Sequence, residues 1–468
     1  MAKKKTAQKE IKVAYIGGGS RYWAQMVMTD LALAPELTGE IVLYDVNYGA
    51  ALKNVKRAKD IYGHKDAKTV FKVSATKSIR KALTGADFVF LSILPGPMQM
   101  FANDIDIPKK YGILQPVGDT TGPGGISRAM RTVPIYEDYA RQIMRYCPDA
   151  WVINYTNPMT LCTRSLYATE PDIKAFGCCH EVFGTQNRLS RIVQEARGLK
   201  QKPARQEIKT DVAGVNHFTW VTRALYQGED IFPLVDKHIR QKGFWSDKSE
   251  WAEEQKARGK FFGSQGRVAF DLYRRFGALG AAGDRHLAEF VPWYTTSEEN
   301  LHRWGVVLTP SEFRLGTWEP PQNAPSQDDD AKKKTQKDED KLKGSGEEGV
   351  LQMLALLGMA DLDTNVNIPN RGQIPELPLD AVVESNAQFR HDSLRPVTPT
   401  PLPAGASALV RRIVDMQELT LRACQEKSKD LAFQAMLLDP LCRVPTDQAK
   451  KMFNEMVRAN KDMLEGWK

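Results

Sequence analysis

Cysteine, histidine and glutamate side chains adjoin one another in the segment GCCHEVFG, residues 177–184. A short apolar run, residues 173–176, precedes the segment and a helical pattern begins near Thr185, so a strand passes into a helix here. In parallel α/β sheets this carboxyl end of a strand is where ligands bind. Thiolate and imidazole groups can bind a metal or move protons. Taken alone, Cys179 is more typical of a buried thiol, because free cysteine is among the most buried residue types.

Two further polar segments are expected at the same edge of a sheet. Residues 115–125 are rich in Gly and Pro, which is typical of a structural corner or an active-site loop. Arg128 and Arg131 open the helix that follows, three residues apart and so on one face. The sequence NYTNP closes another strand, and the carboxamides of Asn154 and Asn157 could hold a cofactor or a hydroxyl-rich ligand. Alternatively, Asn157 caps the next helix.

The N-terminal elements predict a dinucleotide site. Residues 11–16 form an apolar strand pattern, followed by the run GGGS, a helical pattern, and a second strand at residues 40–45. Glycines let the backbone approach a pyrophosphate at the helix N-terminus, and a terminal acid accepts from the ribose hydroxyls. Tyr22 stands where G-x-G-x-x-G has its third glycine, and a plain tight turn is the alternative. The acid favours NAD over NADP, because it would repel a 2′-phosphate. The residues expected at NAD are Gly17, Gly18, Gly19, Ser20, Asp45 and Asn154.

Strand and helix patterns alternate through the first half, which predicts an α/β fold with a Rossmann-type, doubly wound parallel sheet. From about Gln206 the pattern changes, and residues 208–215 and 218–225 are expected as antiparallel strands, with helical segments after them. We therefore expect an NAD-binding domain at residues 1–200. A second, α+β domain at residues 201–468 would bind substrate and supply subunit contacts. Further parallel strands are expected at residues 70–73, 87–93, 151–154 and 173–178.

Composition excludes several classes of protein. Of the 468 residues, 42% are hydrophobic and 26% are charged, as in an ordinary globular protein. The net charge of +8 comes without a compact basic and aromatic patch, so nucleic acid is not an expected partner. No apolar run approaches the roughly 18 residues needed to span a membrane, and no secretory segment follows the basic N-terminus. We expect a cytoplasmic protein whose six cysteines are reduced thiols.

Several segments together resemble glycoside hydrolase family 4, which departs from the usual two-carboxylate chemistry of glycosidases. They are IGGGS at residues 16–20, TNP at 156–158, CHEV at 179–182 and GVNHF at 214–218. Within the family the chain is most similar to the α-galacturonidases. That similarity is carried by GDTTGPGG at residues 118–125, GCCHEVFG at 177–184 and AGDRHLAEF at 282–290.

The resemblance implies redox-neutral chemistry. In this family NAD removes a hydride from C3 of the sugar, and the resulting ketone acidifies the hydrogen on C2. A base removes that hydrogen, the glycosidic oxygen leaves, water adds, and the hydride returns. A divalent metal, usually Mn²⁺, polarises the C3 oxygen.

The resemblance also implies roles for particular residues. Cys179 and His217 match the positions that hold the metal. The resemblance therefore favours Cys179 as a metal ligand over the interpretation as a buried thiol. His180 matches the position of a proton donor or substrate contact. Asp284 aligns with the base, and Asp119 is a second candidate for assisting the leaving group or for capping its own turn. Which of His180 and Asp119 donates the proton stays open.

The expected substrate is an α-linked galacturonide of short pectic oligosaccharides. Family members that act on 6-phosphosugars carry Asn or Asp after the metal cysteine, so His180 argues against a phosphorylated sugar. A uronate needs a planar, bidentate partner, which arginine provides. Arg285, Arg128 and Arg131 are the candidates, with Arg285 first because it adjoins the expected base. Asn157 and His180 are further substrate contacts.

Other functions stay possible on the sequence alone. An α-glucosidase or α-galactosidase of the same family, or an NAD-dependent sugar dehydrogenase, fits the same cofactor pattern. A homodimer or homotetramer is expected. The aromatic residues Trp245, Trp251, Phe261 and Phe262 could line a sugar pocket, but their spacing is more typical of a core.

Overall fold

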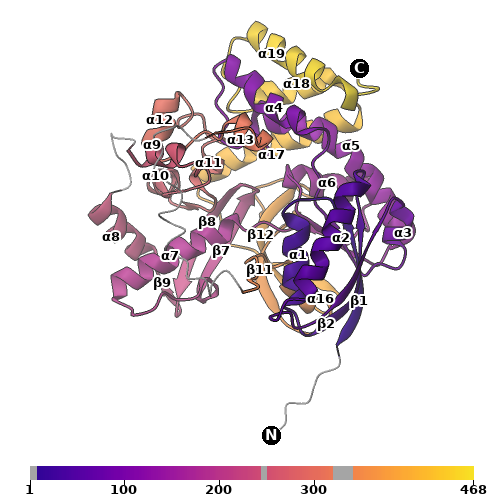
Figure 1. The fold of residues 1–468 in the computed structure, drawn as a ribbon. Coiled ribbons are helices and arrows are strands. Elements are labelled where there is room, and N and C mark those ends of the chain that lie inside the picture. The colour runs from indigo at the N-terminus through magenta and orange to yellow at the C-terminus, as the bar shows by residue number, and fades with distance from the viewer. Residues whose placement is uncertain (1–7, 244–249, 320–340) are drawn as a thin grey trace.

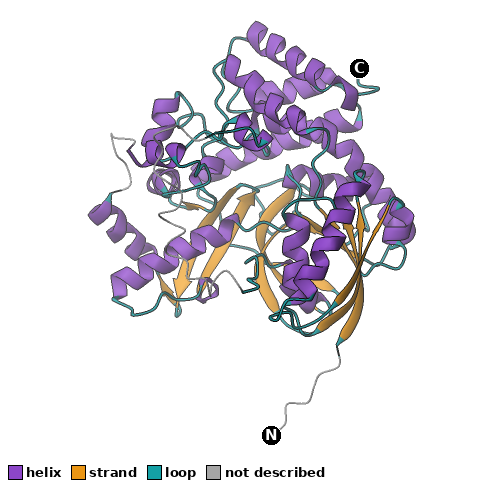
Figure 2. Cartoon of the chain, viewed as in Figure 1, coloured by secondary structure: helices purple, strands orange, loops and turns teal. Residues whose placement is uncertain are grey.

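The computed structural model describes residues 8–243, 250–319 and 341–468, which form a continuous mixed sheet with helices on its faces (Figures 1 and 2). The parallel strands of the N-terminal half lie in the order 3-2-1-4-5-6, the order of the Rossmann fold. The doubly wound parallel sheet expected from the sequence is therefore confirmed. From the edge inward the strands are β3 (Phe71–Thr76), β2 (Leu37–Tyr44), β1 (Lys9–Ile16), β4 (Phe88–Leu91), β5 (Trp151–Asn154) and β6 (Ala175–Gly177).

The antiparallel strands of the C-terminal half extend this same sheet. Strand β11 pairs with β6, with Asn367 opposite Gly177, and the sheet then continues through β12, β7, β8 and β10. The expected antiparallel pair is present as β7 and β8. The division into two domains near residue 200 stays a prediction. The bounds are β11 (Leu362–Pro369), β12 (Val382–Arg390), β7 (Ile208–Val215), β8 (Phe218–Tyr226), β10 (Leu279–Gly280), β9 (Glu229–Asp230) and β13 (Ser393–Pro396).

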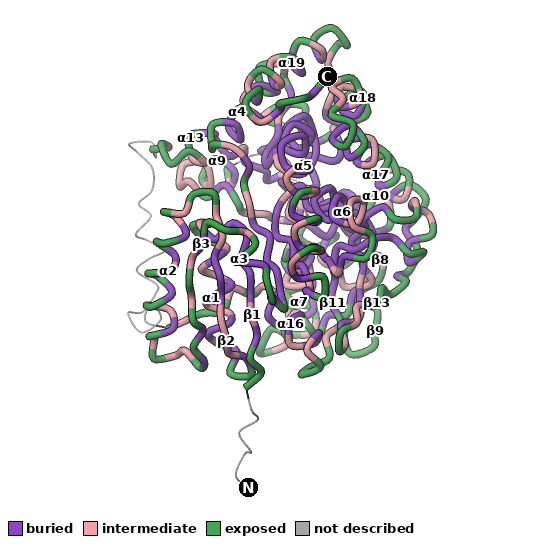
Figure 3. Tube along the Cα trace, turned by 90° about the vertical axis from the view of Figure 1, so that its right-hand side faces the viewer, coloured by how far each residue is buried: buried purple, intermediate pink, exposed green. Residues whose placement is uncertain are grey.

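Alternate side chains of β1 enter two different cores. Val13 and Tyr15 pack with α1, α2 and α16 on one face, and Ala14 and Ile16 pack with α3, α5 and α6 on the other. Because helices cover both faces, the strand is almost continuously apolar. Figure 3 shows α5 as a largely buried helix inside the molecule. The helices are α1 (Trp23–Ala32), α2 (Tyr48–Tyr62), α3 (Ile79–Leu83), α5 (Gly122–Tyr146), α6 (Met159–Thr169) and α16 (Gly349–Leu356).

The C-terminal helices pack back onto N-terminal ones. Helix α17 contacts α5 and α6, and α19 contacts α4, so segments far apart in sequence lie together at the top of Figure 1. The chain is mainly helical from residue 404 to residue 459. No helix in the described part of the chain is long and apolar enough to cross a membrane. The remaining helices are α4 (Met98–Lys110), α7 (Glu181–Arg197), α8 (Phe232–Lys242), α9 (Glu250–Ala257), α10 (Arg267–Phe276), α11 (Asp284–Leu287), α12 (Glu298–Arg303), α13 (Ser311–Leu315), α17 (Ala404–Gln425), α18 (Lys429–Leu438) and α19 (Thr446–Ala459).

The Gly-rich segment is partly helical, which the sequence did not predict. Helix α5 already begins at Gly122, whose backbone N–H donates to Asp439 Oδ2 at 2.8 Å. A Cβ atom on Gly124 would lie 2.7 Å from the backbone oxygen of Asp104 and 2.8 Å from that of Gly118, so only glycine fits this first turn. The residues just before the helix, Asp119 among them, are therefore held in a tightly packed turn.

Candidate active site

A cavity of about 200 Å³ opens where β5 and β6 end. Its wall combines the start of α7, the β7–β8 turn, the turn before α5, and residues of α11 and α13. These elements come from both halves of the chain, so the site forms only when the halves pack together. The lining residues are Trp23, Val117, Asp119, Tyr155, Asn157, Met159, Cys178, Cys179, His180, Glu181, His217, Phe262, Arg285, His286 and Arg314.

Cys179 and His217, the expected metal pair, both line this cavity. Thr120 Oγ1 lies 2.9 Å from Nδ1 of His217, which leaves Nε2 for a ligand. The side chain of Asn216 contacts the thiol, and its Oδ1 atom is buried without a hydrogen-bond partner. A soft sulfur and an imidazole nitrogen suit a divalent transition metal, so the residues fit such an ion.

The described residues hold no group of three or more His, Cys, Asp or Glu side chains arranged around a common metal position. An ion bound by Cys179 and His217 would therefore need further ligands from a bound molecule. Sugar hydroxyls can supply such oxygen ligands. Burial raises the pKa of the Cys179 thiol, so metal binding would have to displace its proton.

His180 stands at the start of α7 and is half exposed at the cavity. Its Nδ1 atom lies 2.6 Å from Oε1 of Glu347, a buried carboxylate just before α16. The hydrogen bond to Glu347 raises the pKa of His180 above its ordinary value. The imidazole can therefore carry a proton near neutral pH. Glu347 belongs to no motif of the sequence, and no local signal indicated this contact.

Asp119 lines the cavity and is surrounded by cations. Its Oδ1 atom accepts a hydrogen bond from Thr120 Oγ1 at 2.9 Å. Burial alone would raise the pKa of Asp119, but the nearby guanidiniums of Arg128 and Arg314 outweigh burial and hold the pKa below its usual range. The carboxylate is therefore an anion, which cannot donate a proton to a leaving group.

The expected role of Asp284 as the base is contradicted by its position. Asp284 is fully buried, and it is not among the cavity-lining residues. Its Oδ2 atom accepts from Ser264 Oγ and from the backbone N–H groups of Gly266 and Arg267, at 2.6–3.0 Å. Its Oδ1 atom accepts from two further N–H groups of α10. Asp284 therefore caps helix α10, and its carboxylate has no free lone pair to face a sugar.

His286, two residues further on, faces the cavity instead. Its ring centre lies 4.0 Å from that of His217, and its Nδ1 atom is buried without a partner. Its Nε2 atom lies 3.5 Å from Oε1 of Glu181. Burial, helped by the charge of Arg285, lowers the pKa of His286 to about 3, so the ring is neutral. The motif GDRH pointed to this helix but not to this residue.

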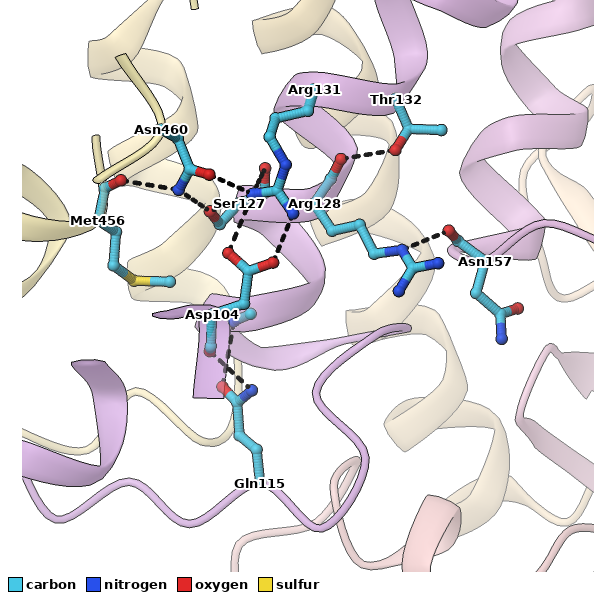
Figure 4. Close-up of polar contacts among 10 residues, drawn as sticks. Asp104, Gln115, Ser127, Arg128, Arg131, Thr132, Asn157, Met456 and Asn460 are labelled. Carbon is cyan, nitrogen blue, oxygen red and sulfur yellow. Dashed lines mark hydrogen bonds and ion pairs between the residues drawn. The ribbon is translucent and has the colours of Figure 1, made fainter. Parts of the chain in front are cut away.

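Two of the three candidate arginines do not line the cavity, and their side chains bond to other protein groups instead (Figure 4). Arg131 forms a bidentate ion pair with Asp104 at 2.6 and 3.0 Å, with both side chains fully buried, so it cannot bind a substrate carboxylate. Arg128 donates from Nε to the backbone oxygen of Asn157 at 2.8 Å and does not line the cavity. Arg128 therefore supports Asn157, which does line the cavity, and the expected direct contact between Arg128 and substrate is corrected.

Arg285 lines the cavity as expected, and Arg314 joins it there. Each guanidinium lies over a phenylalanine ring, Phe262 at 4.7 Å for Arg285 and Phe101 at 4.5 Å for Arg314. Each donates one hydrogen bond to a carbonyl of the Gly-rich segment, and each Nε is buried without a partner. Burial and the charge of Arg285 lower the pKa of Arg314 to about 10. Arg314 lies in a short helix with no motif, so the sequence did not indicate it.

The aromatic residues divide between core and cavity. Phe261 is buried against Phe313 and Trp318, as the core interpretation predicted. Phe262 is 61% exposed and lines the cavity, which contradicts that interpretation. Trp245 lies outside the described residues.

The glycine run forms a tight turn at the carboxyl end of β1. Gly17 has a φ of +92°, and a Cβ atom on it would lie 1.9 Å from the backbone oxygen of Ser92. The carboxylate of Asp45 follows β2 and accepts from the N–H of Gly19 at 2.8 Å. Trp23, which begins α1 after this turn, lines the cavity. The close backbone packing and the acid fit a pyrophosphate and a ribose beside the cavity.

The side chain of Asn154, by contrast, forms all its hydrogen bonds with other groups of the protein. Its Oδ1 atom accepts from Tyr136 Oη at 2.7 Å and from the backbone of Thr156. Its Nδ2 atom donates to Thr156 O and Thr163 Oγ1. Because Asn154 is fully buried and all its hydrogen bonds are internal, its expected contact with the cofactor is wrong.

Residues 12–195 match the model described as family 4 glycosyl hydrolase, and residues 212–442 match the model of that family's C-terminal domain. The chain is 46% identical to an alpha-galacturonidase of Thermoanaerobacterium saccharolyticum, which covers 98% of this chain and 97% of the relative. It is 42% identical to an alpha-galacturonidase of Bacillus subtilis, covering 96% and 97% of the two chains.

Solved structures share the fold. The crystal structure of lplD from Bacillus subtilis, 42% identical, superposes with a TM-score of 0.84 and covers 96% of this chain and 99% of its own. A 6-phospho-alpha-glucosidase from gut microorganisms, in complex with NAD and Mn²⁺, is 20% identical and superposes with a TM-score of 0.74 over 97% and 99% of the chains. Together, these similarities and the matched models show that the chain belongs to family 4 of the glycosyl hydrolases.

Proposed function

We propose that this glycosyl hydrolase cleaves α-linked galacturonides from short pectic oligosaccharides, with NAD and a divalent metal such as Mn²⁺. The observation that most supports a uronate substrate is the pair of cavity-lining arginines, Arg285 and Arg314. The names of relatives that are 41–46% identical over nearly the whole chain support the same substrate.

The charges around the cavity favour an anionic sugar. The two guanidiniums of Arg285 and Arg314 carry two positive charges, and Asp119 is the nearby anion. Glu289, beside Arg285, contributes little negative charge, since burial raises its pKa to about 8. Each arginine keeps N–H groups that no protein atom accepts, and a planar guanidinium can hold a carboxylate through two parallel hydrogen bonds. A uronate would therefore supply the missing negative charge.

The residues that would hold the cofactors lie on two sides of the site. Gly17, Gly18, Gly19, Ser20 and Asp45 would hold NAD, and Cys179 with His217 would hold the metal. When bound, NAD takes and returns the hydride at C3 of the sugar, and the metal polarises the C3 oxygen. Similar folds solved with NAD, and with manganese, support this assignment.

Acid and base roles fall to two histidines. His286 is neutral and lines the cavity, and its Nε2 atom lies 3.5 Å from Oε1 of Glu181, whose carboxylate would stabilise the imidazolium formed when His286 takes the proton from C2. His180 carries a proton supported by Glu347, so it can protonate the departing glycosidic oxygen. Asp119 stays ionised and orders the turn beside them. These assignments replace Asp284 as the base and favour His180 over Asp119 as the acid.

A panel of nitrophenyl glycosides tests the proposal. With NAD and Mn²⁺ present, we expect the α-galacturonide to release nitrophenol while the NADH absorbance shows no net rise. The α-galactoside and α-glucoside should react far more slowly, because neither carries a carboxylate. A preference for either neutral sugar would contradict the uronide assignment. NADH formed in step with substrate consumption would indicate a sugar dehydrogenase.

A further inference from the structure

We propose that Thr120 is a positioning residue that fixes the tautomer of His217, so that Nε2 of the imidazole presents its lone pair to the metal. This inference depends on the proposed function, which places a metal at Cys179 and His217. The sequence analysis assigned Thr120 no chemical role, although Thr120 lies within the segment GDTTGPGG.

The hydrogen bonds at the Thr120 hydroxyl have a defined direction. Thr120 is almost fully buried, and its Oγ1 atom lies 2.9 Å from Oδ1 of Asp119 and 2.9 Å from Nδ1 of His217. A hydroxyl has a single proton, and an ionised carboxylate can only accept one. The Thr120 proton therefore goes to Asp119. The contact with His217 is then favourable only if Nδ1–H donates to Oγ1.

This hydrogen bond sets the tautomer of His217. A neutral imidazole with its proton on Nδ1 has its lone pair on Nε2. His217 lines the cavity, and Nδ1 is turned onto Thr120, so Nε2 is the nitrogen that can bind a ligand there. Histidine ligands in metal sites commonly have their second nitrogen fixed in this way, which sets both tautomer and ring orientation.

The turn that carries Thr120 is held in place by hydrogen bonds with two side chains. Glu289 Oε1 accepts from the backbone N–H groups of Val117 and Gly118 at 2.6 and 2.9 Å. Arg314 donates to the carbonyl oxygen of Val117 at 2.8 Å. Glu289 and Arg314 thus hold the residues just before Thr120. Thr120 therefore has a fixed position from which it can orient the imidazole of His217.

Thr121 offers a matched control. Its hydroxyl is equally buried, but it donates to Oδ2 of Asp439 at 3.0 Å and does not contact His217. Thr120→Val and Thr121→Val therefore remove the same group from adjacent positions of one turn. Thr120→Ser restores the hydroxyl at the first position.

The test is the affinity for Mn²⁺ of the full-length protein saturated with galacturonate, whose hydroxyls supply the remaining ligands. It is measured from the electron paramagnetic resonance of the free ion, with NAD binding followed by calorimetry. We expect Thr120→Val to weaken Mn²⁺ binding about 10- to 100-fold. Thr120→Ser and Thr121→Val should bind Mn²⁺ like the wild type, and all variants should keep their NAD affinity, which shows that they are folded.

Two contrary results are distinguishable. If the wild type binds Mn²⁺ through Cys179 and Thr120→Val binds it equally well, the role of Thr120 is overturned while the proposed function stands. If Mn²⁺ binding by the wild type is absent or unaffected by Cys179→Ser, the metal site itself is overturned, and the role of Thr120 with it.

Discussion

Replacing Cys179 by serine is expected to lower glycoside turnover by about 10³-fold or more. A serine hydroxyl is a much weaker ligand than a thiolate for a transition metal, and metal polarisation is worth several kcal/mol of barrier lowering. The measurement is nitrophenol release from the α-galacturonide with saturating NAD and Mn²⁺. NAD binding should persist, because the glycine turn after β1 does not include Cys179.

Cys162→Ser is the control for this substitution. Cys162 is a fully buried thiol in α6 that does not line the cavity, so its loss perturbs packing without touching the site. We expect this variant to keep turnover near that of the wild type. Undiminished activity in Cys179→Ser would remove Cys179 from the metal site.

Replacing Arg314 by methionine is expected to lower kcat/KM for the galacturonide by about 10²-fold. A buried hydrogen bond to a charged group is worth about 1.5–3 kcal/mol, and each 1.4 kcal/mol is about tenfold. Arg285→Met should have a similar effect. The kcat/KM for the neutral α-galactoside should change little, because that sugar has no carboxylate to lose a partner.

Arg314→Lys separates charge from geometry. Lysine keeps the positive charge but cannot form the planar, bidentate contact, so we expect an intermediate loss on the galacturonide. An equal fall on galacturonide and galactoside in all three variants would instead indicate that the arginines only support the Gly-rich segment, whose carbonyls they contact.

The parallel half of the fold was predictable because its signals are local. Each strand is followed within a few residues by its turn and helix. The pattern at β1 and β2 predicted the fold and also predicted that Asp45 follows the second strand, beside the glycine turn. The continuation of the sheet was not predictable in this way. It depends on one contact between Gly177 and Asn367, nearly two hundred residues apart, and no periodicity encodes such a pairing.

The site was predictable to the level of segments but not always of side chains. In the short helix α11, successive residues point about 100° apart, so one residue caps α10 while its neighbours face the cavity. The sequence motif could not show that Asp284 turns inward and His286 outward. Arg314 and Glu347 lie in segments without any motif, and only tertiary packing brings them to the cavity and to His180.

The most direct test of the central claim is hydrolysis of the α-galacturonide in deuterated water with NAD and Mn²⁺. If the C2 hydrogen is removed and later replaced from solvent, galacturonate released by the enzyme should carry deuterium at C2, detected by NMR or mass spectrometry. Product kept in the same buffer without enzyme controls for spontaneous exchange. Hydrolysis at the normal rate with no deuterium at C2 would contradict the elimination route and point to direct displacement at the anomeric carbon.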